Sequence, residues 1–114
     1  MLDLAHSLHD GVLVLRPSGR LDAGTAADFT DRVEALAPTC ASGRIVLDLE
    51  VLDYISSAGL RVVLAAAKAA RAKGGGMTLC GLRGNVAQVM AVSGFDQVLG
   101  VHADVAAAVA AATA

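Results

Sequence analysis

The spacing of hydrophobic positions changes several times along the chain, from short runs typical of buried strands to the three- and four-residue spacing of amphipathic helices. A β-rich run at 12–15 follows the turn dipeptide Asp10-Gly11 and predicts an opening hairpin, which Pro17 and Gly19 would close. The apolar segment 44–49 is short and β-branched. It favours a central strand that is covered on both faces.

Two segments have the pattern of a helix with one buried face. In the first, Asp22 would act as the N-cap, Pro38 would mark the end, and the buried stripe would consist of Ala26, Phe29, Val33 and Leu36. The second begins at Ser57 and runs to about Lys73, where three glycines at 74–76 can take the left-handed conformation of a helix end. A phosphate-binding loop would need its glycines between a strand and a following helix, so this glycine run predicts a helix stop.

The last third of the chain continues the alternation of strands and helices. Its pattern predicts a strand at 77–82, a short helix capped by Gly94, a further strand at 96–101 and a final alanine-rich helix capped by Asp104. Strands that alternate with helices pair in parallel. We therefore expect one α/β domain over residues 1–114, with a mixed, mostly parallel β-sheet, an N-terminal antiparallel hairpin and about four α-helices.

Composition and charge disfavour two classes of function, nucleic-acid binding and membrane insertion. Hydrophobic residues make up 55% of the chain and aromatic residues only 3%, which predicts an aliphatic, alanine-lined core. A net charge of −2, without a basic stripe interleaved with aromatic residues, disfavours nucleic-acid binding. The chain does not begin with a signal-peptide pattern, and charged residues interrupt its apolar stretches, so we expect a cytoplasmic protein that does not insert into a membrane.

The cysteines and histidines give no sign of a disulfide or a metal centre. Cys40 and Cys80 are expected to be reduced, mostly buried thiols, because a cytoplasmic chain with this much core does not need a disulfide. His6, His9 and His102 are scattered, and neither CxxC nor HxxxH occurs. We therefore expect no metal and no cofactor.

Two adjacent serines stand where a predicted strand ends and a predicted helix begins, in the stretch "DYISSAGLRVV" at 53–63. Either Ser56 or Ser57 can cap the helix by accepting a hydrogen bond from an early backbone N–H group. The same place favours a phosphate, because free N–H groups and the positive end of the helix dipole stabilise anions. Capping and phosphorylation are therefore compatible roles for this pair.

A serine hydrolase is the enzymatic alternative for Ser57. Its nucleophile elbow would need glycine two residues before the serine, where this chain has Ile55. Asp96 and His102 follow in the order of a catalytic triad, yet 114 residues leave little room for that larger fold and a substrate pocket. We therefore expect that the protein is not an enzyme.

Three stretches, "GRLDAGTAADF", "IVLDLEVLDYISSAGLRVVLAAAKAARAKGGGMTLCGL" and "VMAVSGFDQVL", together resemble the STAS domain of bacterial anti-sigma factor antagonists over nearly the whole chain. In that family, an anti-sigma factor that is also a serine kinase of the GHKL ATPase type phosphorylates the antagonist, and a PP2C-like phosphatase removes the phosphate. The unphosphorylated antagonist binds the anti-sigma factor and releases the sigma factor for transcription. The resemblance implies the same partner switching here.

By position, the resemblance implies that Ser57 is the phosphoacceptor, with Ser56 as the alternative. Ser56 stands where many members have aspartate. The acid of the "RLDAGTA" loop, Asp22, would face the partner, whether or not it also caps a helix. Arg61 would contact an acidic partner or remain solvated. The expected partner-binding set is Asp22, Thr25, Ser56, Ser57, Gly59, Leu60 and Arg61.

Two other roles within the same family stay open. The chain could be a kinase-independent scaffold of the stressosome type, or the small soluble STAS subunit of a lipid-transport ATPase complex. Phosphate on neither Ser56 nor Ser57 would favour these roles over the switch. Nothing in the sequence requires more than a monomer.

Overall fold

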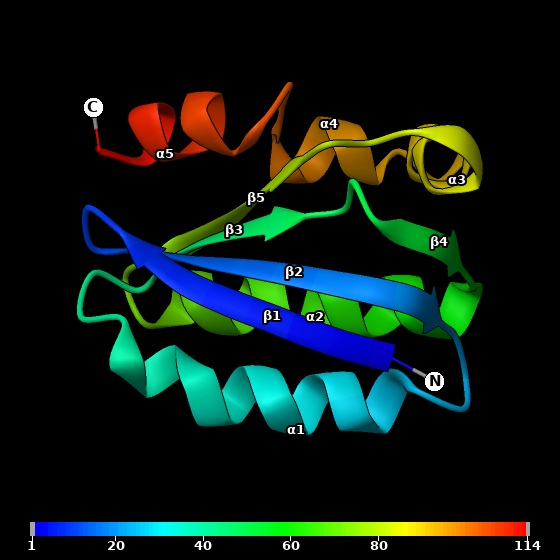
Figure 1. Ribbon diagram of the computed structural model, residues 1–114, viewed down its shortest axis with the longest axis horizontal. Helices are drawn as coiled ribbons and strands as arrows, with labels where there is room; N and C mark the ends of the chain where they lie inside the picture. Colours follow the sequence, from blue (N-terminus) through cyan, green and yellow to red (C-terminus); the bar gives the residue numbers. More distant parts are fainter. Residues whose placement is uncertain (1, 114) are drawn as a thin grey trace.

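A six-stranded β-sheet forms the centre of the computed structural model, which describes residues 2–113 (Figure 1). The strands are β1 (Leu2–His9), β2 (Val12–Leu21), β3 (Arg44–Asp48), β4 (Leu52–Ile55), β5 (Gly76–Cys80) and β6 (Val101–His102). Their order is β1-β2-β3-β5-β6, and β4 pairs with the end of β2. β1 and β2 are antiparallel, whereas every other pair is parallel, which confirms the mixed, mostly parallel sheet with an opening hairpin.

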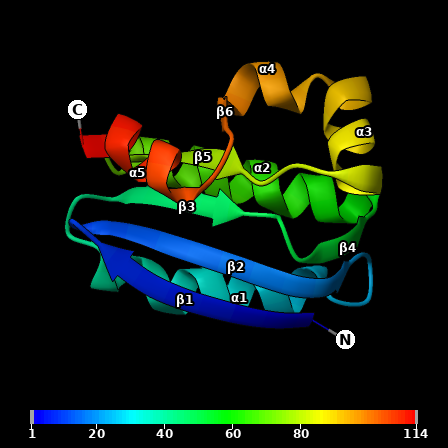
Figure 2. The same ribbon diagram turned by 45° about the horizontal axis from the view of Figure 1, so that its top comes forward.

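Helices cover both faces of this sheet (Figures 1 and 2). They are α1 (Ala26–Leu36), α2 (Ser57–Ala72), α3 (Gly84–Ser93), α4 (Phe95–Leu99) and α5 (Val105–Thr113), and a 3₁₀ turn at Ala37–Thr39 follows α1. α1 and α2 lie over one face, where Phe29, Val33 and Val63 join the larger hydrophobic cluster. α5 covers part of the other face, where Ala108 and Val109 pack with Val46 of the central strand. β3 is thus buried on both sides, as its apolar run predicts.

The opening hairpin turns at the predicted dipeptide but is longer than expected. Asp10 and Gly11 have φ of 53° and 81°, the left-handed values that a two-residue type I′ turn requires. The prediction that Pro17 and Gly19 end the strand is wrong, because β2 continues to Leu21. Pro17 lies between the segment of β2 that pairs with β3 and the segment that pairs with β4, so its missing N–H leaves no ladder bond unmade.

Residues 95–102 contain the second error of the sequence prediction. The strand expected at 96–101 is mostly the short helix α4, and only Val101–His102 joins the sheet as β6. Gly94, at φ 79°, ends α3 in the left-handed conformation and is followed at once by α4, so its expected role as a cap is confirmed. Residues 2–113 therefore contain five α-helices where about four were expected.

The remaining boundaries follow the predicted signals. α2 begins at Ser57 and ends at Ala72, and Gly74, which follows the C-cap Lys73, takes φ of 87°. The carboxylate of Asp104 accepts a hydrogen bond from Ala107 N–H at 2.9 Å and caps α5. Cys40 and Cys80 are free, buried thiols. Within residues 2–113, no helix combines the length and apolarity needed to cross a bilayer, and no group of three or more potential metal ligands occurs.

Candidate functional site

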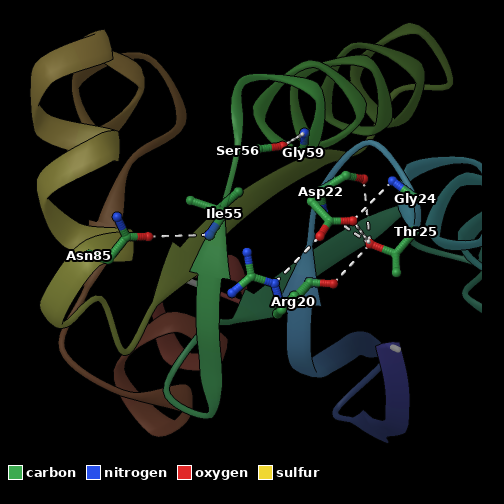
Figure 3. A network of polar contacts seen from close by, with 8 residues as sticks. All are labelled: Arg20, Asp22, Gly24, Thr25, Ile55, Ser56, Gly59 and Asn85. Atoms are coloured by element: carbon green, nitrogen blue, oxygen red, sulfur yellow. Dashed lines mark hydrogen bonds and ion pairs between the residues drawn. The ribbon is translucent and has the colours of Figure 1, made fainter.

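The two serines have different places at the start of α2. Ser56 is the N-cap: its backbone is extended, and its Oγ accepts a hydrogen bond from Gly59 N–H at 3.2 Å (Figure 3). Its own N–H donates to the carbonyl of Leu21 at 3.0 Å, which joins the start of α2 to the end of β2. Ser56 is half-buried and is held from both sides, so it fixes the position of the helix start.

Ser57 is the first residue of α2, and its side chain is exposed. Because Ser56 supplies the cap, the Ser57 hydroxyl is not needed for it. The first turn of a helix carries free N–H groups and the positive end of the dipole, and both favour negative charge there. Ser57 is therefore an exposed hydroxyl in a place where an added phosphate is compatible with the helix.

The loop between β2 and α1 lies beside this helix start (Figure 3). Asp22 Oδ1 accepts a hydrogen bond from Gly24 N–H at 3.0 Å, and the Asp22 carbonyl accepts from the N–H groups of Thr25 and Ala26. Thr25 Oγ1 donates to the Arg20 carbonyl at 2.8 Å and accepts from Asp22 N–H at 3.0 Å. These bonds close the loop upon itself and fix the direction of the Asp22 carboxylate.

The expectation that Asp22 is the N-cap of α1 is wrong. The cap position belongs to Thr25, whose side chain makes no capping bond. The reason is that Asp22 lies four residues before the first helical residue, so its carboxylate reaches only Gly24 within the loop. Asp22 thus organises the loop and leaves α1 to begin without a side-chain cap.

The Asp22 carboxyl is held in its ionised form. Desolvation raises its pKa, but hydrogen bonds from Gly24 N–H, from Arg20 and from Thr25, together with the charge of Arg20, outweigh this effect. The result is a pKa below the ordinary value for aspartate. Arg20 Nε lies 3.5 Å from Asp22 Oδ2. The loop therefore presents a partly neutralised negative charge next to the serines.

Arg20 and Tyr54 form a pair that the sequence prediction missed. They are opposite one another in the β2–β4 ladder, and the Arg20 guanidinium lies 4.1 Å from the centre of the Tyr54 ring. Sequence spacing does not bring positions 20 and 54 together, because nothing local predicts that the strand before the serines pairs with the end of β2. Only the aromatic character of Tyr54 just before the serines could have indicated a contact.

Gly59 and Leu60, two members of the expected partner-binding set, are buried. A Cβ atom on Gly59 would lie 2.4 Å from the Leu21 carbonyl oxygen, so glycine is what allows α2 to approach β2 this closely. Leu60 belongs to the hydrophobic core cluster. Both residues therefore position the helix start, whereas Ser57 and Arg61 present exposed side chains on it.

Asn85 is a second residue that the sequence did not single out. Its Oδ1 accepts a hydrogen bond from Ile55 N–H at 3.3 Å and so joins the start of α3 to β4 (Figure 3). The segment before the serines is consequently held by β2 on one side and by α3 on the other. This supports a rigid presentation of Ser57.

The arrangement does not favour hydrolase chemistry. Ser57 follows β4, which pairs with β2, whereas His102 lies on β6, which pairs with β5. Along the path of the sheet, β3 and β5 lie between β2, the partner of β4, and β6. The structure therefore brings together the expected loop and helix start, and it separates His102 from Ser57.

Comparisons with known proteins place this geometry in a family context. The family model described as "STAS domain" matches residues 5–108. The chain is 43% identical over 86 residues to BtrV of Bordetella bronchiseptica, whose name provisionally describes an anti-sigma factor antagonist. That match covers 75% of this chain and 73% of BtrV. The chain is also 31% identical over 94 residues to the anti-sigma F factor antagonist of Paenibacillus polymyxa, covering 82% and 80% of the two chains.

The solved structures agree on the fold. A crystal structure of an anti-sigma factor antagonist from Mycobacterium paratuberculosis matches with a TM-score of 0.89 and 22% sequence identity. The match covers 100% of this chain and 96% of that chain. At this level of identity the likeness establishes a shared fold, which includes the mixed sheet and the helices that carry the candidate site.

Proposed function

The chain belongs to the STAS domain family, and we propose that it acts as an anti-sigma factor antagonist whose binding is switched off by phosphorylation of Ser57. In the unphosphorylated form it binds an anti-sigma factor and thereby frees a sigma factor for transcription. The anti-sigma factor is a serine kinase of the GHKL ATPase type, and a PP2C-like phosphatase restores the free serine. The protein acts as a binding module in the cytoplasm and not as an enzyme.

The different structural roles of the two serines are the observation that carries this proposal. Ser56 caps α2 through Gly59 N–H, and Ser57 is exposed as the first helical residue. A kinase can reach an exposed hydroxyl without unfolding the helix start. After transfer, the phosphate stands at the positive end of α2, so the helix tolerates the modification that changes its surface.

Charge gives the switch its direction. Asp22 is ionised beside the helix start, and a phosphate on Ser57 adds about −1.5 to −2 charges to the same surface. A partner that accepts the neutral hydroxyl would have to desolvate this dianion, and any acidic group opposite it would repel it. A coupling of about 1–3 kcal/mol is typical of such switches and corresponds to roughly 5- to 150-fold in affinity.

The expected partner-binding surface consists of the half-buried Asp22 and the exposed Ser57 and Arg61, supported by Thr25, Ser56, Gly59 and Leu60. Thr25 fixes the Asp22 loop, whereas the other three set the position of α2. Each chain carries this surface complete, so one chain is sufficient to bind one anti-sigma factor.

Phosphorylation by a kinase from the same genome tests the proposal. The purified chain is incubated with ATP and a candidate GHKL kinase, and the phosphate is located by mass spectrometry. We expect phosphate on Ser57, none on the Ser57→Ala variant, and retention of phosphate on Ser56→Ala, which keeps the acceptor. Phosphate on neither serine with any such kinase would contradict the switch and favour the kinase-independent scaffold or the ATPase-complex subunit.

A further inference from the structure

Strand β1 is an end strand of the sheet. It pairs with β2 along its whole length and, within residues 2–113, with no other strand. Such an edge presents unpaired backbone N–H and C=O groups that can bind another strand. The edge is eight residues long, from Leu2 to His9, which is longer than the typical strand of five to six residues.

The type I′ turn fixes which backbone groups of β1 face outward. In a two-residue hairpin, the residues that flank the turn exchange both hydrogen bonds, and bonded positions then alternate along the strand. The residues that direct their groups toward β2 are therefore His9, Ser7, Ala5 and Asp3. Those that direct them outward are Leu8, His6, Leu4 and Leu2. Arg32 donates to the Leu2 carbonyl at 3.4 Å, in agreement with this assignment.

Several features that usually protect an edge strand are absent from β1, although Asp3 near its N-terminal end carries a charge. The strand contains no proline, lysine or arginine, and its register with β2 runs without a shift from Leu2 to His9. The Arg32 side chain covers only the Leu2 carbonyl at one end. Leu8, near the other end, leaves 54% of its surface exposed. The stretch from Leu4 to Leu8 is thus an open edge beside an exposed apolar side chain.

We propose that this edge pairs with β1 of a second copy of the chain, antiparallel and about a two-fold axis, so that one sheet runs through both copies. Outward-facing residues must then bond to outward-facing residues. Since Arg32 occupies the Leu2 carbonyl, the register that uses the open stretch places Leu4 opposite Leu8 and His6 opposite His6.

The side chains are self-complementary in this register. Leu4 lies on the buried face of β1, so Leu8 of one copy would extend the apolar face of the other and lose its exposure. On the opposite face, Asp3 stands across from His9, whose Nε2 lies 2.8 Å from Ser7 Oγ of the same strand, so the two residues form a polar pair across the interface. An unrelated extended peptide would not supply both matches. These two matches are the reason for choosing a second copy as the occupant.

A single pair of strands makes a small interface, so the association is weak and depends on concentration. We expect a dissociation constant between about 1 μM and 1 mM. The expectation of a monomer from the sequence changes accordingly at high concentration. The dimer is independent of the proposed switch, because it needs neither a kinase nor Ser57.

Sedimentation velocity over a concentration series tests the proposal with the chain alone. We expect the mass to rise from one copy to two, and Leu8→Lys to weaken the association by at least about tenfold, because lysine is a typical guard of edge strands. Val92→Lys is the matched control, since Val92 is 90% exposed on α3, far from this edge in sequence. It should leave the association unchanged within about twofold.

A crosslinking variant tests the register. His6→Cys should form an intermolecular disulfide under mild oxidation, because directly opposite, hydrogen-bonded residues have Cα atoms about 5.5 Å apart, within the range a disulfide spans. Val92→Cys should not do so at the same concentration. A chain that stays monomeric up to about 1 mM would overturn the proposal. Equal loss of association in Leu8→Lys and Val92→Lys, or equal crosslinking of the two cysteine variants, would also overturn it.

Discussion

Replacing Gly59 by alanine tests how closely α2 must approach β2 to present Ser57. The added Cβ would lie 2.4 Å from the Leu21 carbonyl oxygen, 2.9 Å from Ile55 Cγ1 and 3.0 Å from Leu21 Cγ. The nearest atom is backbone, and the same carbonyl accepts the N–H of Ser56, so no change of rotamer relieves the contact. The start of α2 must therefore move away from the sheet.

The expected cost follows from two opposing effects. Overpacking of a well-packed core costs about 1–3 kcal/mol, and the better helix propensity of alanine returns up to about 1 kcal/mol. We expect a net loss of about 1–2 kcal/mol in the free energy of unfolding. With a urea m-value of about 2 kcal/mol/M, the middle of the usual range, the unfolding midpoint should fall by roughly 0.5–1 M.

Urea unfolding followed by circular dichroism measures this loss. Gly76→Ala is the matched control, because a Cβ there meets nothing within 4 Å and its φ is not left-handed. The control should be neutral or slightly stabilising, by about 0.4–1 kcal/mol, since alanine restricts the unfolded chain. A Gly59→Ala variant as stable as the Gly76→Ala variant would refute the close approach of α2 to β2.

Three further predictions concern single side chains. Ser56→Ala should lower the free energy of unfolding by about 0.5–2 kcal/mol in urea titrations, because Gly59 N–H loses its cap, whereas Ser57→Ala should cost much less. The pKa of Asp22 is lowered in the folded state, so the ionised Asp22 carboxylate stabilises the fold above its unfolded pKa, and this contribution is lost as pH falls through its folded pKa. In urea titrations at decreasing pH, Asp22→Asn should therefore lose less stability in acid than the parent chain. Burial, followed by the charge of Asp48, raises the pKa of Cys80 from 9.0 to about 12. The neutral Cys80 thiol therefore contributes its full stability to the fold below pH 9, and this contribution is lost as pH rises toward 12. Stability curves of Cys80→Ala that fall as steeply as the parent's over that range would contradict this assignment.

Much of the fold was predictable because local signals agreed with the tertiary structure. The Asp10-Gly11 turn, the continuous apolar run of β3 and the glycines after α2 each act within a few residues. The strand expected at 96–101 failed for the opposite reason. Its residues have no strong local preference, and the left-handed turn at Gly94 directs the chain into α4 before it reaches the sheet.

The candidate site shows the same division. The serines and the Asp22 loop could be found from the sequence, because each lies at an element boundary with a recognisable cap or turn residue. The distinct roles of Ser56 and Ser57 could not, since one residue of difference in the helix start decides which hydroxyl caps. Arg20, Tyr54 and Asn85 join the site through contacts between segments that are distant in the sequence. The spacing of residues along the chain does not predict such contacts.

The affinity of the chain for its anti-sigma factor, measured with and without phosphate on Ser57, tests the central claim most directly. Isothermal titration calorimetry would compare the unmodified chain, the Ser57-phosphorylated chain and Ser57→Ala with the same kinase-type anti-sigma factor. We predict tight binding of the unmodified chain and of Ser57→Ala, and binding weaker by about 5- to 150-fold for the phosphorylated chain. Equal affinity of the phosphorylated and unphosphorylated chains would contradict the account.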